Sequence, residues 1–248
     1  MPESFDDIQK KYYKTAEIKR FQWQTENVYI KKKEIKLLEK LVQFINPEDS
    51  ILEAGCGEAA NIINLRASGI VNYITAIDFS ETKIKFCNSL NISNTNFVQA
   101  DARNLPFEDN TFDITFARDL LHHVNENREE VINEMLRVTK ASGRVIILEG
   151  NGQKPTNYIF ATIFPQEKGM KDSTYEKLTQ LIHKYNGTIT PLECCNTFRL
   201  LLHYNMGMPY LSSIKFICHI LDKFEDICIN FLPHKFWAYW FINIQKNR

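Results

Sequence analysis

Short apolar segments alternate with amphipathic ones through the middle of the chain, and this alternation constrains the fold more than any other feature. The apolar runs have the length of buried strands and span residues 51–54, 73–77, 97–99, 112–116 and 145–148. Helical candidates lie between them, at residues 58–68, 81–91 and 125–139. Strands that are apolar on both faces and separated by helices predict a parallel sheet with right-handed crossovers.

The two ends of the chain have different patterns. Apolar residues recur at helical spacing through the first 46 residues, which end before Pro47. After residue 150 the pattern indicates a helix, a strand, a second helix and an aromatic strand, at residues 171–185, 188–196, 209–230 and 236–244. We expect the last two strands to form a hairpin-like pair at the sheet edge. The aromatic strand is apolar on both faces, which predicts a central position for it.

Composition and charge exclude several classes of protein. Lysine plus arginine balances aspartate plus glutamate at 30 each, so no overall field attracts nucleic acid or an anionic membrane. The six cysteines show no C-x-x-C pairing, which favours a reduced, cytoplasmic protein without a structural metal. No run approaches the roughly 18 to 20 apolar residues of a membrane span, so we expect no stable membrane insertion.

A glycine loop follows the first predicted strand, in the segment 51–60. Gly55, Gly57 and Ala60 fit the relaxed G-x-G-x-x-G/A dinucleotide pattern, and Asp78 lies about 20 residues further on. Glu53 and Glu58, however, flank the loop, and carboxylates repel a pyrophosphate but suit a ligand that carries a sulfonium and an ammonium. The motif also begins about 50 residues into the chain, and no second substrate domain follows. A nicotinamide cofactor is therefore the weaker interpretation.

Further landmarks follow the loop in a fixed order. The segment 53–59 is an acidic residue followed by a glycine pattern, with Ala59 in the third glycine place, where it adds only a methyl group. The later landmarks are Ile77-Asp78-Phe79-Ser80, Phe97-Val98-Gln99-Ala100-Asp101-Ala102, Phe116 to Val124 with its pair of histidines, and Leu136 to Val145. Over roughly residues 48–150 the chain resembles the class I S-adenosylmethionine-dependent methyltransferases, in the branch that includes quinone-biosynthesis and small-molecule enzymes.

The resemblance implies a fold and a division of the chain. The fold would be α/β, a single doubly wound Rossmann-like domain over residues 1–248. Its seven-stranded sheet would be mostly parallel, with one antiparallel C-terminal strand, N-terminal helices and a helical insertion before the last strand. Residues 1–46 would form a helical cover and 48–150 the cofactor-binding half. Residues 151–248 would form the acceptor-side half, with a helical cap at about 205–232.

The resemblance also assigns roles to cofactor-binding residues. Asp78 would accept from both ribose hydroxyls beside Phe79, Asp101 would accept from the adenine amino group, and the Ala102 amide would donate to the ring. The full implied set is Glu53, Gly55, Cys56, Gly57, Asp78, Phe79, Asp101, Ala102, Ala117 and Arg118. The open alternatives are a helix cap for Asp78, a turn role for Asp101 and a structural role for Glu53.

No motif of comparable specificity marks the catalytic and acceptor-binding residues. His122, His123 and Glu149 are the catalytic candidates, because histidine is readily poised as a base near neutral pH and the carboxyl ends of parallel strands bind ligands. Packing or capping is the open alternative for both histidines. The acceptor-binding candidates are Tyr12, Tyr13, Asn151, Met206 and Tyr210. The helix near 209–230 carries an apolar stripe with three possible roles. It could pack in the core, cap an acceptor pocket or contact a membrane surface.

Methyl transfer from a sulfonium is a direct displacement that needs alignment and water exclusion but no metal or covalent nucleophile. We expect transfer from S-adenosylmethionine to a small organic acceptor at nitrogen or oxygen, leaving S-adenosylhomocysteine, by a cytoplasmic monomer or homodimer. A lipid or quinone-like C-methyltransferase is the alternative within the class. A non-catalytic S-adenosylmethionine-binding protein and an NAD-binding oxidoreductase are alternatives from other classes. Nucleic acid is not expected as a partner, because no basic stripe is visible.

Overall fold

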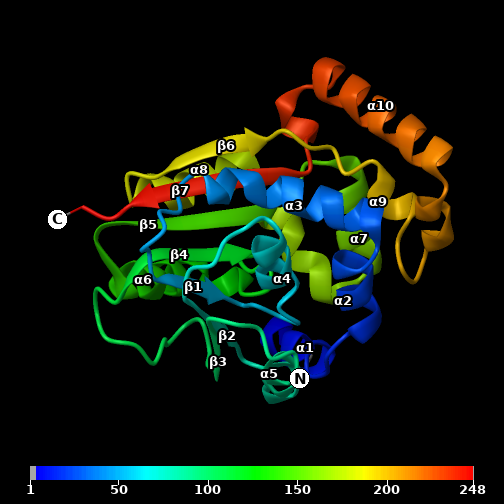
Figure 1. Ribbon diagram of the computed structural model, residues 1–248. Coiled ribbons are helices and arrows are strands. Elements are labelled where there is room, and N and C mark those ends of the chain that lie inside the picture. The colour runs from blue at the N-terminus through cyan, green and yellow to red at the C-terminus, as the bar shows by residue number, and fades with distance from the viewer. Residues whose placement is uncertain (1–3, 248) are drawn as a thin grey trace.

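A computed structural model describes residues 4–247 of the chain, and within them seven strands form one sheet in the order β3-β2-β1-β4-β5-β7-β6 (Figure 1). The strands are β1 (Ile51–Ala54), β2 (Ile74–Asp78), β3 (Thr95–Gln99), β4 (Phe112–Arg118), β5 (Thr139–Gly150), β6 (Thr188–Leu192) and β7 (Tyr239–Gln245). Neighbours from β3 to β5 are parallel, and β7 runs antiparallel to both β5 and β6. The predicted fold class is confirmed.

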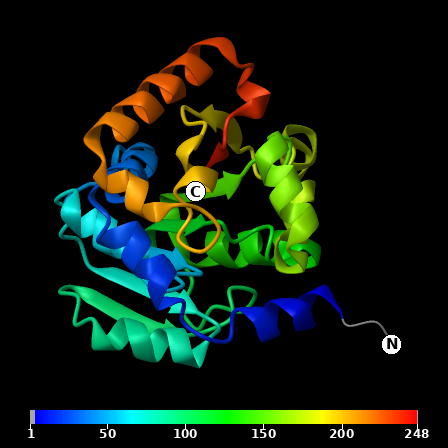
Figure 2. The ribbon, with the colours of Figure 1, turned by 90° about the vertical axis from the view of Figure 1, so that its right-hand side faces the viewer.

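Helices cover both faces of the sheet (Figures 1 and 2). The elements before β5 are α1 (Phe5–Tyr12), α2 (Ile18–Thr25), α3 (Val28–Val42), α4 (Ala60–Ala67), α5 (Glu81–Ser89), η1 (Asn125–Asn127) and α6 (Arg128–Val138). The later ones are α7 (Pro155–Ile163), η2 (Pro165–Asp172), α8 (Tyr175–His183), α9 (Phe198–Leu201), η3 (Pro209–Ser213), α10 (Lys215–Phe231) and η4 (His234–Phe236).

The core has two layers, one on each face of the sheet. One layer packs the apolar residues of α3, α4 and α5 against the strands, with Leu38, Ile62 and Ile84 among them. The other packs α6 and α8 against the opposite face, through residues such as Ile132 and Leu178. The strands β1 and β2 are buried along their whole length, as two-sided apolar strands require.

Four elements after β5 were not predicted from the sequence: α7, η2, α9 and the short η4. Helix α7 carries no charged residue, and Tyr158, Ile159 and Ile163 are exposed on it, so no polar face marks it as amphipathic. The 3₁₀ segment η2 has no apolar period. Residues of α7, η2 and α9 line a cavity at the carboxyl ends of the strands, so these three elements contribute directly to the site.

The sheet order reverses between β1 and β4, because the chain leaves β1 for β2 and returns on the other side for β4. Ligands of open α/β sheets bind outside the carboxyl ends of the strands at such a point. None of the helices within residues 4–247 is long and apolar enough to cross a bilayer.

Candidate active site

A first cavity lies at the carboxyl ends of β1, β2 and β3, over the glycine loop. Its lining residues from the loop and the strand ends include Gly55, Cys56, Gly57, Glu58, Ile77, Asp78, Phe79, Ala100, Asp101, Ala102 and Arg118. Residues of the N-terminal helices, including Gln9, Tyr13 and Arg20, close its outer side. Of the implied cofactor-binding set, all but Glu53 and Ala117 line this cavity.

The loop backbone adopts left-handed conformations at Gly55 (φ +77°), Gly57 (φ +54°) and Ala59 (φ +64°). A Cβ at Gly55 would lie 2.9 Å from the Leu120 side chain, so glycine is also needed there for the loop backbone to pack against Leu120. The alanine at the third glycine place is not free of cost, because the left-handed conformation costs a non-glycine residue roughly 1 to 2 kcal/mol. The tight loop leads directly into α4, whose N-terminus points at the cavity.

Asp78 ends β2 and is buried beside the loop. Its carboxylate accepts from the backbone amides of Gly57 (3.0 Å) and Ser80 (2.9 Å). Burial raises the pKa of this carboxyl group, against the effect of the Lys83 ammonium and the two amides. The helix cap itself is Ser80, which accepts from Lys83 N, so Asp78 is not the capping residue of α5. Its side chain bridges the glycine loop and the start of α5 at the cavity wall.

Asp101 also lines the first cavity and is paired with Arg103 at 2.5 Å. Arg103 also contacts Asp6 of α1 at 3.4 Å, which links the N-terminal helix to the strand end. The half-buried Asp101 therefore has a cationic partner within the chain.

The sequence suggested that Glu53 and Glu58 present free negative charges beside the loop. In the structure both have partners within the chain. Glu58 is paired with Arg20 (2.6 Å) and Lys83 (3.5 Å). Burial alone would raise its pKa, but these cations outweigh it and lower the pKa to about 2. Glu58 is thus already neutralised by cations of the chain, and its charge does not argue against a phosphate ligand.

Glu53 is fully buried behind the loop and does not line the cavity. Its Oε1 accepts from the Asn61 amide at 2.7 Å, whereas Oε2 is buried with no hydrogen-bond partner. Burial raises the pKa of this group to about 8. The Asn61 side chain lines the cavity and donates a hydrogen bond to Glu53. Glu53 therefore orients a cavity residue without lining the cavity itself.

Ala117 and Arg118 end β4 but point to opposite sides. Ala117 is packed in the core layer of α6 and α8, so its predicted place at the cofactor site is wrong. Strand alternation sends the next side chain the other way, and Arg118 lines the cavity. Arg118 is paired with the buried Glu34 at 2.7 Å and contacts Asn61 at 3.0 Å.

A second cavity of about 440 Å³ adjoins the first, beyond the carboxyl ends of β4 and β5. Much of its wall is aromatic or aliphatic: Tyr12, Tyr13, Trp23, Phe160, Phe164, Met170, Leu200, Tyr204, Met206, Phe224 and Tyr239. Tyr13, Arg20, Asp119, His123 and Arg199 line both cavities. The two spaces therefore meet at this wall of five side chains.

His122 lines the second cavity and is buried between two glutamates. Its Nδ1 lies 2.7 Å from Glu149 Oε1, and its Nε2 lies 3.3 Å from Glu167 Oε2. Burial alone would lower the pKa of His122, but the two carboxylates outweigh it and raise the pKa to about 10. His122 is therefore a cation at neutral pH, and both of its nitrogens are engaged.

His123 has the opposite character. Burial and the adjacent His122 charge lower its pKa to about 3, so the ring is neutral at physiological pH. Its Nδ1 is buried without a hydrogen-bond partner. The ring packs edge-on against Tyr13, with centroids 4.7 Å apart, and the Tyr13 hydroxyl donates to Glu167 Oε1 at 2.6 Å. The histidine at the wall between the cavities is thus neutral and unpaired at Nδ1.

Three predicted site residues lie elsewhere. Glu149 is fully buried outside both cavities and accepts from His122 and Ser173, so it positions His122 and does not face the site. Asn151 is also fully buried, and its amide donates to the Lys235 and Trp237 carbonyls, which ties β5 to the segment before β7. Tyr210 is exposed and lines neither cavity. These acceptor and catalytic assignments are corrected accordingly.

Sequence reasoning missed Arg20, Glu167 and Arg199. Arg20 reaches the glycine loop from α2, while Arg199 comes from α9 and Glu167 from η2. Each is a charged residue in a segment with no motif, so no local signal distinguishes it from a solvated surface residue. Their positions are set by tertiary contacts.

His122, His123 and Glu167 offer potential metal-ligand atoms within 4.8 Å of one another. Both nitrogens of His122 and both oxygens of Glu167 already have partners within the cluster and in Tyr13 and Glu149. Hydrogen bonding alone accounts for this arrangement, and the expectation that no metal is needed stays a prediction.

Comparison with known proteins finds a matching domain in the middle of the chain. Residues 52–147 match the model of the methyltransferase domain family. A ubiquinone/menaquinone biosynthesis C-methyltransferase UbiE of Stutzerimonas stutzeri (strain A1501) is 45% identical over 71 residues, covering 29% of this chain and 27% of that protein. A demethylmenaquinone methyltransferase of Mycobacterium sp. (strain JLS) is 33% identical over 126 residues, covering 49% of this chain and 50% of that protein. The chain thus spans about half or less of the length of these relatives.

Among solved structures, the geranyl diphosphate C-methyltransferase of Streptomyces coelicolor A3(2), in complex with Mg²⁺, geranyl diphosphate and S-adenosyl-L-homocysteine, is similar in fold. Its TM-score is 0.64 at 13% identity, with 99% of this chain and 98% of that chain covered. The order of the sequence motifs, the seven-stranded sheet over residues 4–247 and the matched domain all indicate a methyltransferase fold. Residues 52–147 of the chain thus match a methyltransferase domain, and residues 4–247 have the fold of a solved methyltransferase that binds S-adenosyl-L-homocysteine.

Proposed function

We propose that the protein transfers a methyl group from S-adenosylmethionine to a carbon atom of a quinol-like acceptor with an apolar body. The observation that carries the proposal is the shared wall: five side chains line both the cavity over the glycine loop and the aromatic cavity beside it. A donor in the first and an acceptor in the second would meet there, as an in-line displacement requires.

The residues of the first cavity fit the cofactor. Asp78 offers a carboxylate at the end of β2, as the ribose hydroxyls would require, and Asp101 and the Ala102 amide stand where an adenine ring would bind. The glycine loop lets the backbone approach closely, and a Cβ at Gly57 would meet the Arg20 guanidinium at 3.4 Å. When bound, the cofactor supplies an electrophilic methyl group on a sulfonium.

The remaining chemistry belongs to the chain. A hydroxyl on an aromatic acceptor must give up or share its proton before a ring carbon becomes a good nucleophile, and a neutral imidazole can accept that hydrogen bond. His123 has that form at the wall between the cavities. His122 lies beside it with its two nitrogens held by Glu149 and Glu167, so its role is to fix this part of the cavity wall.

The sequence alone favoured a nitrogen or oxygen acceptor, and the relatives support the carbon alternative better. Both reported curated relatives bear names of quinone biosynthesis, and one of them is named a C-methyltransferase. The aromatic and aliphatic wall of the second cavity suits a ring with an apolar substituent.

The test has two parts. Calorimetry should detect binding of S-adenosylmethionine and S-adenosylhomocysteine but not NADH. The protein is then incubated with methyl-labelled S-adenosylmethionine and a reduced, short-tailed demethylmenaquinone, a catechol or a primary amine, and products are identified by mass spectrometry. We expect a C-methylated quinol. A product methylated only at oxygen or nitrogen would overturn the carbon assignment, and the absence of cofactor binding would overturn the function.

A further inference from the structure

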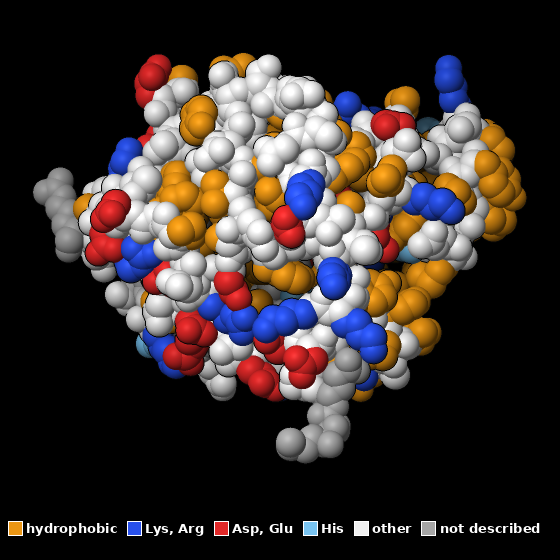
Figure 3. Space-filling view, turned by 90° about the horizontal axis from the view of Figure 1, so that it is seen from below, with side chains coloured by type: hydrophobic (Ala, Val, Ile, Leu, Met, Phe, Trp, Pro, Cys, Tyr) orange, Lys and Arg blue, Asp and Glu red, His pale blue; other side chains and the backbone are white. Residues whose placement is uncertain are grey.

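Exposed apolar side chains gather on one side of the molecule, around the second cavity. They come from α7, the segment 200–210 and α10, and Figure 3 shows hydrophobic side chains gathered at the edge where Figure 1 places α10. Phe216 is 72% exposed, Phe231 81% and Ile163 64%. Scattered single exposed apolar residues are normal, whereas a contiguous set marks an interaction site.

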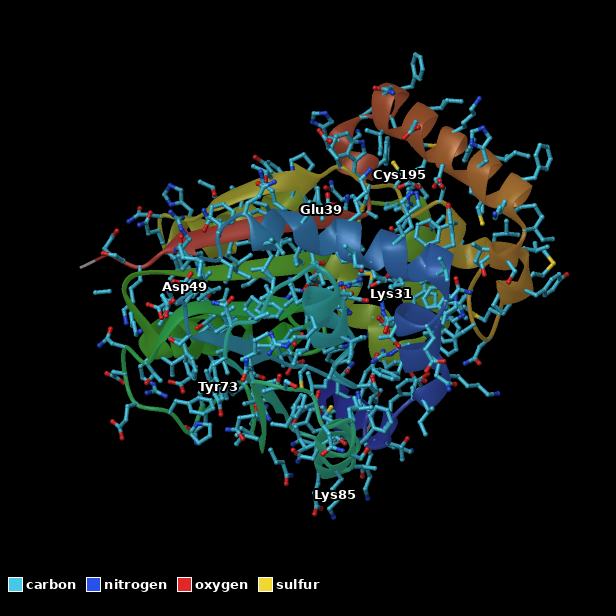
Figure 4. The ribbon with its side chains drawn as sticks, in the orientation of Figure 1. Lys31, Glu39, Asp49, Tyr73, Lys85 and Cys195 are labelled. Atoms are coloured by element: carbon cyan, nitrogen blue, oxygen red, sulfur yellow. The ribbon has the colours of Figure 1, made fainter. Side chains whose placement is uncertain are left out.

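Helix α10 is apolar on two opposite faces. One face packs inward: Leu221 joins the cluster around Trp23, Cys228 packs on Trp237, and Glu225 accepts from the amide of Cys195 at 2.6 Å (Figure 4). The other face carries Phe216, Ile220, Phe224, Ile227 and Phe231, which are all exposed. Their spacing of three or four residues makes one continuous stripe. Core packing therefore accounts for the inner face only.

The exposed apolar surface continues into the second cavity. Leu200, Met206 and Phe224 line that cavity and are also exposed, by 48%, 49% and 53%. Phe160 of α7 and Phe164, which follows the helix, also line the cavity, and Ile159 and Ile163 of α7 are exposed. Figure 2 shows α7 and α10 on opposite sides of the face turned to the viewer. The rim of the cavity mouth is thus apolar on both sides.

The charges on this rim suit a lipid surface. Helix α7 has no charged residue, and Lys171 lies 4.9 Å from the centroid of the Tyr158 ring. On α10, Lys215, Lys223 and Asp226 are exposed, whereas Asp222 is paired with Lys33 and Glu225 is buried, so the exposed charge of the helix is net positive. Aromatic and aliphatic side chains with flanking lysines are typical of elements that lie in a membrane interface. A second copy of the chain would bring the same lysines and would close the mouth against an entering acceptor.

We propose that the rim formed by α7, the segment 200–210 and α10 docks on the surface of a lipid bilayer, and that the acceptor enters the second cavity from the lipid. The docking stands on the exposed rim alone, whereas the route of the acceptor rests on the proposed function. The contact is peripheral, with side chains of the rim inserted among the headgroups and upper acyl chains.

Cosedimentation with sucrose-loaded vesicles tests the docking. The vesicles are phosphatidylcholine alone or phosphatidylcholine with phosphatidylglycerol, and the protein is the full chain. The variant Phe216→Ser/Phe231→Ser removes two side chains that line neither cavity, and Ile159→Ser/Ile163→Ser does the same on α7. Each double variant should lower the partition coefficient by roughly tenfold or more, because each inserted side chain contributes through its buried apolar area.

The matched control is Val71→Ser/Tyr73→Ser, which removes two exposed apolar residues before β2, away from the rim (Figure 4). It should leave the partition coefficient unchanged within about twofold. Equal loss in the control and the rim variants would overturn the proposal, as would the absence of vesicle binding. A stable dimer in analytical ultracentrifugation that Phe216→Ser/Phe231→Ser abolishes would show that a second copy covers the rim, and would overturn it too.

Failure of the docking and failure of the proposed function are distinguishable. Vesicle binding needs no cofactor and no turnover, so it can hold in a protein that methylates nothing. For the route of the acceptor, the rim variants should lower the rate severalfold on a long-tailed quinol in vesicles but not on a short-tailed soluble one. Equal rates on both acceptors would overturn the route.

Discussion

Glu149 positions the His122 cation, and replacing it by glutamine tests that role. Its Oε1 accepts from the His122 amide (3.1 Å), from His122 Nδ1 (2.7 Å) and from the Ser173 hydroxyl (2.8 Å), and Oε2 accepts from the Leu121 amide (3.1 Å). Glutamine keeps the shape and one carbonyl oxygen, but it removes the charge and turns an NH₂ group toward a donor. The variant Glu149→Gln therefore breaks one half of a fully buried ion pair.

Breaking a buried pair costs about 3 to 5 kcal/mol, and Glu167 still faces His122, so we expect a loss near the lower end, about 3 kcal/mol. Urea unfolding at pH 7 followed by circular dichroism measures the free energy of unfolding. The control is Glu126→Gln, an exposed glutamate that should change it by less than about 0.5 kcal/mol. Because Glu149 lines neither cavity, the affinity for S-adenosylmethionine should stay unchanged.

The pH dependence gives a second, independent readout. His122 has a raised pKa in the folded protein, so its contribution to stability is fully present below pH 6.5 and is lost as the pH rises to about 10. In that window the free energy of unfolding should fall by up to about 1.4 kcal/mol per pH unit. Glu149→Gln should flatten this slope. A loss below 1 kcal/mol together with an unchanged slope would refute the reasoning.

Three further predictions concern ligand binding and turnover. Asp78→Ala should weaken S-adenosylmethionine binding by about 2 to 4 kcal/mol in calorimetry, since each charge-assisted hydrogen bond contributes roughly 1.5 to 3 kcal/mol; unchanged affinity in the folded variant would remove the assignment. His123→Ala should lower kcat by roughly 10²- to 10⁴-fold while cofactor affinity holds, and a rate within a few-fold of wild type would leave that ring a packing role. EDTA should not change the rate in a steady-state assay, whereas loss restored by a divalent ion would make the His122, His123 and Glu167 cluster a metal site.

Local sequence patterns predicted the strands, the main helices and the glycine loop. Strand and helix periods are properties of neighbouring residues, so β1, β2 and the loop at Gly55 and Gly57 were placed within a residue or two. Asp78 and Asp101 could be found because they lie at or just after the ends of apolar runs and at fixed places in a motif. The number of strands and the single antiparallel C-terminal strand came from the resemblance to a known family, whereas the order of the strands in the sheet came from the structure.

The rest depended on contacts between segments far apart in the chain. Arg20 neutralises Glu58 across 38 residues, and Glu149 holds His122 across 27. Glu149, Asn151 and Ala117 sit at strand ends that the sequence assigned to the cleft, yet burial directs them into the protein. The sequence by itself determined the sheet and the loop, because these follow from local periodicity and turn chemistry. Only the tertiary structure decided which histidine is charged, which carboxylates face the site and which apolar residues remain exposed, because those properties depend on what packs against each side chain.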